Sequence, residues 1–284
     1  MEAKKLKIAV LIANSDFTSL QNDKNLLQIY GESILQITYY KLKPIFDKVL
    51  VIVNSFDQQS IYSRQLGEDV LVNLNENKNE LTAALTALNA CKNIPGAEFV
   101  FFAKTNMPLL VKKAIELILG KQTAEQSAII PQHSNGTIES LHALYKIKPA
   151  LQAFERAAND EKETVAAALN YLPKISFLPM SEIIKVDPQL QSFFEVESEI
   201  DYQRAKEKLS GKIKTRIRKA EKIKTGIERE RETETTIYLK VPGSEEEHEV
   251  LFNKRAKKWN CDCQHFVMKG TYCSHILAAQ NFQG

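Results

Sequence analysis

The fold class of this chain is decided by two apolar stretches, KIAVLIA at Lys7–Ala13 and KVLVIVN at Lys48–Asn54. Nearly unbroken runs of Val, Ile and Leu are typical of strands that are buried on both faces of a sheet. Three later runs have the same character and are also predicted strands: Val70–Leu74, Glu98–Ala103 and Ser127–Pro131.

Stretches with helical spacing lie between these strands, at Asn25–Leu42, Glu80–Cys91 and Leu109–Leu119. Strands that alternate with helices predict an α/β fold, with a mostly parallel, Rossmann-like sheet that is covered by helices on both faces. Ligands bind at the carboxyl ends of the strands in such sheets. We therefore expect a binding site in the loops at 14–24 and 104–108.

The composition is that of a folded globular protein. The 284 residues include 44% hydrophobic and 26% charged side chains, with a formal net charge of +3, and these values exclude a chain that is disordered throughout. The longest purely apolar run, Ile8–Ala13, is far shorter than the ~20 residues that span a bilayer, so no membrane partner is expected. The basic and then apolar start resembles a signal peptide, but no small-residue cleavage site follows, and we expect a cytoplasmic protein.

A basic segment separates the two parts of the chain. Residues 204–224 include ten Lys or Arg and two Glu. We expect a boundary near Leu209–Gly211, which gives a domain at 1–209, a charged linker at 210–234 and a small C-terminal domain at 235–284. The basic segment is either a solvated helix or linker, or a surface that contacts the phosphates of a nucleic acid.

The segment WNCDCQHFVMKGTYCSHILAA, Trp259–Ala279, carries most of the cysteine of the chain. Cys261-x-Cys263 is followed, after nine residues, by Cys273-x-His275. Three thiolates and one imidazole match a closed tetrahedral site for structural Zn²⁺, which leaves no open position for catalysis. The alternative is that the cysteines cluster by chance and that the histidine belongs to a core.

This spacing resembles the SWIM-type zinc finger, whose pattern is Cys-x-Cys, a variable gap and Cys-x-His. Trp259 and the strand-like runs Thr235–Val241 and His248–Phe252 fit the β-hairpin that leads into such fingers. The rival ligand His265 lies outside the pattern. The resemblance implies a small hairpin and helix domain that binds zinc, with a nucleic acid or a protein as its partner. A domain of this size would take much of its folding free energy from the metal.

Five segments of the first 209 residues follow the order and spacing of another family. They are IANSDFTSLQNDKNLL at Ile12–Leu27, YGESILQITYYKLKPIFDKVLVIVN at Tyr30–Asn54, FVFFAKTNMPLL at Phe99–Leu110, IPQHSNGTIESLHALY at Ile130–Tyr145 and SFFEVESEIDYQRAKEKL at Ser192–Leu209. Together they resemble the MobA-like NTP transferases, which include the molybdenum-cofactor guanylyltransferases. The resemblance implies a fold like that of the nucleotide-diphospho-sugar transferases, with a nucleotide as candidate ligand.

The opening motif of this family is only partly present. It has a glycine pair where this chain has Asn14 and Ser15, and an arginine where this chain has Ser19. Glycines in such a loop let the backbone approach phosphate groups. Asp23 and Lys24 match the motif, and the alternative is that they are ordinary surface charges.

The family's carboxylate for magnesium is also replaced. The aspartate of its Asp-Met-Pro motif aligns with Asn106, and an asparagine of its closing segment aligns with Glu195. If these two loops meet, the two side chains could form a weak site for Mg²⁺, because a hard cation prefers anionic oxygen. The resemblance thus implies the following nucleotide-binding residues, none of them catalytic: Asn14, Asp23, Lys24, Asn106 and Glu195.

Two functions follow from these patterns. The first is a zinc-binding protein whose finger and basic segment 204–224 bind a nucleic acid or a protein, attached to a degenerate transferase-like domain that is inactive. The second is an active nucleotidyltransferase that uses Mg²⁺ and is recruited by the finger. Nucleotidyl transfer needs a cation that bridges the phosphates and donors for the developing charge, and the sequence replaces two of those groups. The first function is therefore the prediction.

Overall fold

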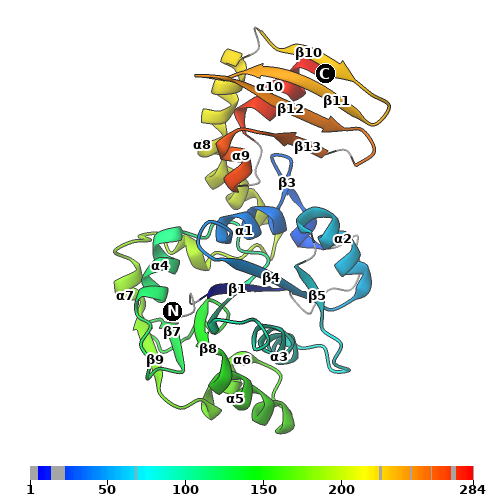
Figure 1. Ribbon diagram of the computed structural model, residues 1–284. Helices are drawn as coiled ribbons and strands as arrows, with labels where there is room; N and C mark the ends of the chain where they lie inside the picture. The colour runs from blue at the N-terminus through cyan, green and yellow to red at the C-terminus, as the bar shows by residue number, and fades with distance from the viewer. Residues whose placement is uncertain are drawn as a thin grey trace. The chain divides into compact units, whose positions relative to one another are not determined.

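The computed structural model describes residues 6–13, 23–67, 69–223, 226–243, 245–256, 258–269 and 273–283. The chain divides into a large unit, Met1–Gln28 with Ser33–Asp201, and a small unit, Ile29–Glu32 with Tyr202–Gly284. Figure 1 labels the elements of each. The main division falls at residue 202, about two helical turns before the expected boundary at 209–211, because helix α8 (Glu199–Ile223) runs through that boundary without a break.

In the described part of the chain, the large unit is built on a seven-stranded sheet with the order β5-β4-β1-β6-β8-β7-β9. The strands are β1 (Leu6–Ile12), β4 (Lys48–Val53), β5 (Val70–Val72), β6 (Ala97–Lys104), β7 (Ala128–Gln132), β8 (Ala143–Lys146) and β9 (Ile175–Pro179). Among the described strands of this sheet, only β8 runs antiparallel to its neighbours, β6 and β7. The mostly parallel α/β sheet that the sequence predicts is confirmed.

Helices cover both faces of this sheet (Figure 1). Side chains of β1 alternate between two cores: Val10 belongs to one and Leu11 to the other. The first core also contains side chains of α3 (Glu80–Cys91), α5 (Ile147–Asn159), α6 (Val165–Ala168) and the short helix η3 (Leu169–Tyr171). The second contains side chains of α1 (Ile34–Leu42), α2 (Phe56–Leu66), α4 (Lys112–Gly120) and α7 (Met180–Ile183). Burial of alternate residues on both faces explains why the strands are nearly continuous apolar runs.

The predicted helix at Asn25–Leu42 is wrong in its first half. The chain forms a short helix η2 (Lys24–Leu26) and a tight hairpin of β2 (Gln28–Ile29) and β3 (Glu32–Ser33) before α1 begins. Tyr30 and Gly31 turn the hairpin with positive φ angles, 55° and 84°. Ser33 then caps α1 in a reciprocal hydrogen-bonded arrangement with Gln36, which fixes the start of the helix after the turn.

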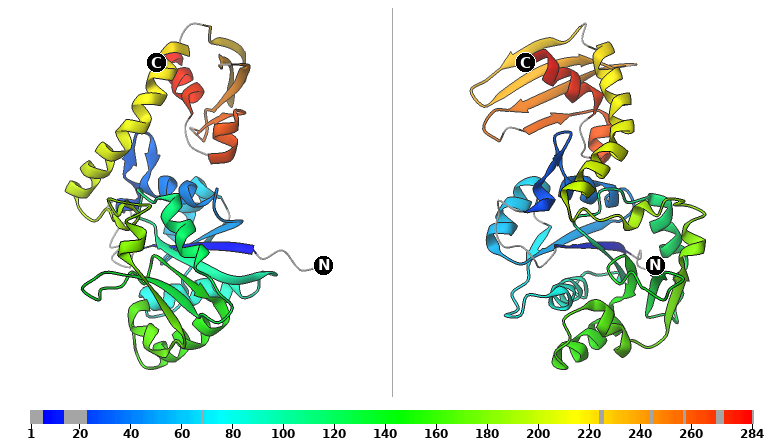
Figure 2. Two further views of the ribbon diagram at one scale, coloured as in Figure 1. Left: turned by 90° about the vertical axis from the view of Figure 1, so that its left-hand side faces the viewer. Right: turned by 180° about the vertical axis from the view of Figure 1, so that it is seen from behind.

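The small unit contains a four-stranded antiparallel sheet in the order β10-β11-β12-β13. Its elements are α8, β10 (Glu228–Glu232), β11 (Thr236–Pro242), β12 (Glu247–Asn253), β13 (Lys258–Cys261), α9 (Gln264–Lys269) and α10 (Ser274–Gln283). Ile237, Leu239 and Val241 alternate along β11 toward a core that also holds Ala220 of α8 and Ile276 of α10. Figure 2 shows α10 and α8 on one face of this sheet.

The segment that the sequence predicts as a charged linker, 210–234, has regular structure in this unit. Its first part is the second half of α8, and residues 228–232 form the edge strand β10. The hairpin that was predicted from the runs Thr235–Val241 and His248–Phe252 is formed by β11 and β12. None of the helices in the described ranges combines the length and apolar character that crossing a bilayer requires.

Candidate functional site

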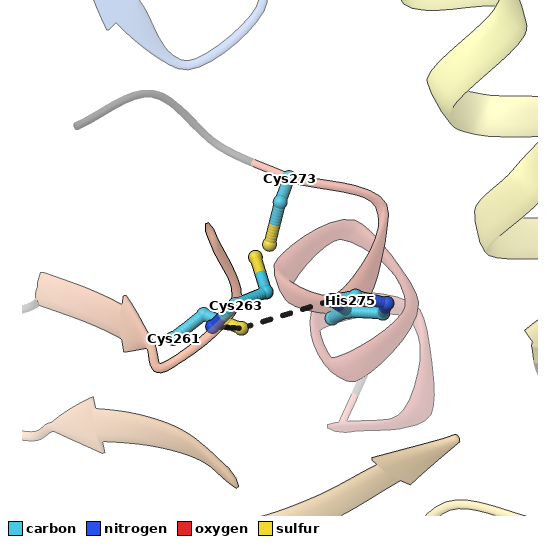
Figure 3. A group of neighbouring side chains, drawn as sticks. All are labelled: Cys261, Cys263, Cys273 and His275. Carbon is cyan, nitrogen blue, oxygen red and sulfur yellow. Dashed lines mark hydrogen bonds between the residues drawn. The ribbon is translucent and has the colours of Figure 1, made fainter. Parts of the chain in front are cut away.

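Four side chains of the small unit converge on one point (Figure 3). The ligand atoms of Cys261, Cys263, Cys273 and His275 all lie within 4.8 Å of one another, and Cys261 Sγ lies 3.8 Å from His275 Nδ1. Zn–S bonds of ~2.3 Å in a tetrahedron place two sulfur atoms roughly 3.8 Å apart, so one ion fits between these atoms. The residues that the sequence selects as zinc ligands are therefore brought together, and the donor set suits structural zinc.

Backbone structure positions each ligand. Cys261 ends β13 and Cys263 directly precedes α9, so a bend between the two cysteines turns both sulfur atoms to one side. Cys273 directly precedes α10, and the backbone N–H of Ile276 donates to its Sγ at 3.5 Å. The backbone N–H of Cys263 donates to Cys261 Sγ at 3.5 Å. Such donors stabilise the thiolate form that ligates a metal.

The three cysteines are 3–5% exposed. A hydrogen bond from Cys261 lowers the pKa of Cys273, and the same hydrogen bond together with burial raises the pKa of Cys261. Burial also raises the pKa of Cys263. Zinc must therefore displace protons from Cys261 and Cys263 when it binds, since only thiolates are ligands.

His248 of β12 supports the cluster. Its ring centroid lies 4.2 Å from that of His275, and its Nδ1 lies 3.0 Å from Asp262 Oδ1. The other carboxylate oxygen of Asp262 accepts a 3.1 Å hydrogen bond from the backbone N–H of Glu249. Because Asp262 lies between the two cysteines of the Cys-x-Cys pair, these bonds tie the ligand loop to β12. The Cys-x-Cys and Cys-x-His pattern does not include His248, and its place in the strand next to the motif was the available signal.

A cavity of about 790 Å³ lies beside the cluster. Its wall includes the ligands Cys263, Cys273 and His275, the lysines Lys219 and Lys222 of α8, the acids Glu245 and Glu246, and the histidines His248 and His265. His265 therefore lies on the cavity wall and is not part of the converging group. The cavity wall has both positively and negatively charged side chains, so its charge does not indicate whether a nucleic acid or a protein binds there.

The large unit places Asp23 and Lys24 in hydrogen bonds within its own fold. Asp23 is 5% exposed, and its carboxylate accepts hydrogen bonds from the Tyr62 hydroxyl at 2.8 Å and from the backbone and side-chain N–H groups of Asn25 at 3.0 and 2.9 Å. Lys24 Nζ donates to the backbone carbonyl of Glu197. The reading of Asp23 as a surface charge is wrong, because it is a buried cap of η2. Asn14, Ser15 and Ser19 lie outside the described residues.

The carboxyl end of β6 carries an ion pair that the sequence analysis missed. Lys104 ends β6, and its Nζ lies 2.8 and 2.9 Å from the two carboxylate oxygens of Glu195. Burial by itself lowers the pKa of Lys104, but attraction to Glu195 and then to Glu80 and Glu197 raises it overall. A lysine directly after a buried apolar strand was the available signal, since strand ends at this edge form binding sites.

Glu80 is the second carboxylate near Lys104. It opens α3, and one of its oxygens accepts a 2.8 Å hydrogen bond from the backbone N–H of Val165. Burial raises the pKa of Glu80, while the bond from Val165 and the charge of Lys104 oppose that change. Two carboxylates thus act on the ammonium of Lys104, Glu195 by direct contact and Glu80 electrostatically.

The loops that carry Asn106 and Glu195 do meet. Asn106 is 5% exposed; its carbonyl accepts a 3.0 Å hydrogen bond from the N–H of Val196, and its Nδ2 lies 3.4 Å from the carbonyl oxygen of Val196. Its Oδ1 has no hydrogen-bond partner in the part of the chain that the structure describes. These residues do not fit the Mg²⁺ that the family resemblance implies, because an amide stands in place of one carboxylate and Lys104 pairs with the other.

Comparison with known proteins shows which families the sequence of this chain matches. The sequence model of the MobA-like NTP transferase domain matches residues 17–171, more than half of the chain. The chain belongs to the MobA-like NTP transferase family. The SWIM zinc finger model matches residues 241–279, which include all four converging ligands. Both resemblances that the sequence analysis identified are confirmed.

Relatives of this MobA-like chain include probable molybdenum cofactor guanylyltransferases. The protein of that name from Methanosarcina acetivorans is 23% identical over 193 residues, which are 67% of this chain and 85% of the relative. The one from Thermococcus kodakarensis is 26% identical over 201 residues, 69% of this chain and 92% of the relative. Both alignments span about the length of the large unit.

Solved structures share its fold. The molybdopterin-guanine dinucleotide biosynthesis protein A of Archaeoglobus fulgidus aligns with a TM-score of 0.61 at 21% identity, over 72% of this chain and 100% of that protein. The 4-diphosphocytidyl-2C-methyl-D-erythritol synthase of Anaerococcus prevotii aligns with a TM-score of 0.52 at 10% identity, over 72% of this chain and 96% of that protein. The likeness confirms the nucleotide-sugar transferase-like fold that was predicted.

Proposed function

We propose that this chain is a zinc-binding protein whose SWIM-type finger binds a nucleic acid or a protein, and whose MobA-like domain keeps the transferase fold without nucleotidyl transfer. The observation that carries the second part is that the two candidate carboxylates are already committed. Asp23 accepts hydrogen bonds from Tyr62 and Asn25, and both oxygens of Glu195 contact Lys104. Glu195, the carboxylate of the expected Mg²⁺ site, is thus paired with an ammonium.

The chemistry of nucleotidyl transfer explains why this matters. The reaction requires a cation that bridges phosphate oxygens and neutralises the charge that develops on the leaving pyrophosphate. At the end of β6 this chain offers the neutral amide of Asn106 and an ammonium that is held by Glu195. The ammonium carries one positive charge and only donates hydrogen bonds, so it neutralises less of the developing phosphate charge than Mg²⁺ does.

The test is a direct assay of the purified, zinc-loaded chain. GTP and CTP are titrated with Mg²⁺ while pyrophosphate release is measured in the presence of phosphorylated acceptors. We expect no turnover that depends on Mg²⁺. Release of pyrophosphate that requires Mg²⁺ and disappears in Glu195→Gln would overturn the proposal.

A second candidate is an active MobA-like nucleotidyltransferase, with a phosphorylated acceptor and Mg²⁺, that the finger recruits to its target. It is favoured by the names of the relatives, which are probable molybdenum cofactor guanylyltransferases. The same assay separates the two proposals, because only this one requires turnover.

The proposed role of zinc is structural. Four protein ligands close the coordination sphere, so the ion would hold β13, α9 and α10 together and leave no position for a substrate. Binding partners would then contact the surface of the finger, its cavity or the basic segment 204–224. Thiolate ligands persist where thiols stay reduced, which supports a cytoplasmic location.

Binding assays at low salt distinguish the two classes of partner. Affinity for single- or double-stranded RNA or DNA that falls steeply as salt rises would support a nucleic acid, since released counterions drive such binding. Absence of any binding at low salt would exclude nucleic acid and leave a protein as the partner.

A further inference from the structure

We propose that the ammonium of Lys104 is a built-in cation, which occupies the place of a divalent metal at the carboxyl end of β6. Removing it should turn the surrounding oxygens into a divalent-cation site. This inference rests on the proposed function, because a domain that used a metal at this point would need Glu195 free.

The contact geometry is that of a cation held by a chelating carboxylate. Lys104 Nζ is nearly equidistant from both oxygens of Glu195, at 2.8 and 2.9 Å. A divalent cation binds a bidentate carboxylate in the same manner, at the shorter distance of about 2.0–2.6 Å. The Lys104 and Glu195 side chains are only 25% and 21% exposed, so the pair is mostly shielded from solvent. An ion in place of the ammonium would face the same two oxygens of Glu195 at a shorter distance.

The charge around this position exceeds what one ammonium neutralises. Glu195 binds it directly, and Glu80 and Glu197 lie close enough to act on it electrostatically. Lys24 lies nearby but is bonded to a backbone carbonyl, that of Glu197, and not to a carboxylate. Carboxylates other than Glu195 thus also act on the ammonium, as expected of a site that can hold a charge of +2.

Neutral oxygens lie on the two residues that follow Lys104 in the chain. Asn106 follows Lys104 by two residues and is hydrogen-bonded to Val196, the residue after Glu195. Asn106 Oδ1 and Thr105 Oγ1 are buried and have no hydrogen-bond partner among the described residues. Buried polar atoms nearly always have a partner, so two at the end of one strand are unusual. Amide and hydroxyl oxygens are ligands that hard cations accept.

A surface ion pair of the same unit provides the matched control. Lys121 Nζ lies 2.6 Å from Glu182 Oε2, and both side chains are more than a third exposed. No unpartnered buried oxygen belongs to this pair in the described ranges. Removing Lys121 leaves a lone exposed carboxylate, which binds divalent cations only weakly.

The experiment measures Mn²⁺ binding by electron paramagnetic resonance on the full, zinc-loaded chain. The variants are Lys104→Met, Lys121→Met and the double variant Lys104→Met/Glu195→Gln. We expect Lys104→Met to bind one Mn²⁺ at least tenfold more tightly than the wild type and Lys121→Met do. The double variant should lose this gain, because Glu195 would be the principal ligand.

Equal binding by Lys104→Met and Lys121→Met would overturn the inference, and so would tight Mn²⁺ binding by the wild type that depends on Glu195. If Lys104→Met unfolds because its carboxylates repel one another, refolding with Mn²⁺ should restore its circular dichroism spectrum, and failure to do so counts against the proposal. Turnover by the wild type with Mg²⁺ would instead refute the proposed function, and the pyrophosphate assay detects it independently of Mn²⁺ binding.

Discussion

His142 makes the stability of the large unit depend on pH. Its side chain is fully buried, and both ring nitrogens lack a hydrogen-bond partner in the described part of the chain. The ring packs against Phe101 of β6 at 5.1 Å and against Phe193 of the short helix η4 (Gln191–Phe193) at 4.6 Å, centroid to centroid. The ring therefore packs between β6, which ends at Lys104, and η4, which lies just before Glu195.

The magnitude follows from the pKa of this group. Burial lowers the pKa of His142 from 6.5 to about 3. As the pH falls through about 6.5 the unfolded chain takes up a proton that the folded chain refuses, so stability is present above this pH and is lost below it. The free energy of unfolding should fall by about 1.4 kcal/mol per pH unit, or roughly 2.5 kcal/mol between pH 7 and pH 4.5. This is a large part of the ~5–15 kcal/mol that stabilises a typical domain.

Urea unfolding at several pH values tests this reasoning, with hydrogen exchange of peptides from β6 and β8 as the local readout. The leucine of His142→Leu has a similar volume and no titratable group. The slope of the free energy of unfolding against pH should therefore be smaller in this variant than in the wild type, by about 1.4 kcal/mol per pH unit over the same range. Equal slopes in the wild type and His142→Leu would refute the argument, whatever the absolute stability of the variant.

Three further predictions concern the zinc unit and the cap of η2. Cys263→Ser should abolish stoichiometric zinc in elemental analysis and hydrogen-exchange protection of the small unit, since structural zinc supplies about 10–16 kcal/mol at pH 7; protection of the large unit should persist, and retained zinc would disprove the ligand assignment. Replacing Lys219 and Lys222 by Gln should reduce the salt slope of nucleic-acid binding by about 1.4–1.8 if both contact phosphates; an unchanged slope would place the contacts elsewhere. Tyr62→Phe should lower the free energy of unfolding by about 1–3 kcal/mol, because buried Asp23 loses a hydrogen-bond donor. Urea unfolding of the large unit measures this change, and an unchanged free energy would show that the hydrogen bond does not stabilise the fold.

Long apolar strands and the helix α3 could be predicted from the sequence. β1, β4 and β6 are buried on both faces and therefore appear as apolar runs, and α3 begins and ends where its spacing indicated. β9 was missed because only Leu178 of its five residues is buried, which leaves no apolar run to detect. α2 was missed because its sequence is mostly polar and only Gln58 and Tyr62 are buried in it.

The segment 210–234 shows a second reason why structure could not be predicted from the sequence. Its charged composition is typical of a solvated linker, yet Ala220 of α8 enters the core of the small unit. All five residues of β10 are exposed, so the strand is held by backbone pairing with β11 and not by a buried face. Neither a small buried residue nor backbone pairing leaves a hydrophobic pattern in the sequence.

The zinc cluster and the Lys104–Glu195 pair also differ in how far they could be predicted from the sequence. The zinc ligands lie within one short segment and are of a chemically distinctive type, so spacing alone selected them. Lys104 and Glu195 are 91 positions apart, and each is an ordinary charged residue by itself. Only the fold brings them together, at the point where β6 ends and the segment before α8 returns to it.

The pairing of β12 with β13 has a practical consequence. Trp259 is the single tryptophan of the chain; it lies opposite Phe252 with ring centroids 4.6 Å apart, two residues before Cys261. The large unit therefore contributes no indole emission, and intrinsic fluorescence excited at the red edge reports the finger alone. We expect this emission to change when a chelator removes zinc, because Trp259 lies two residues before Cys261, and the change could be followed in real time without a label.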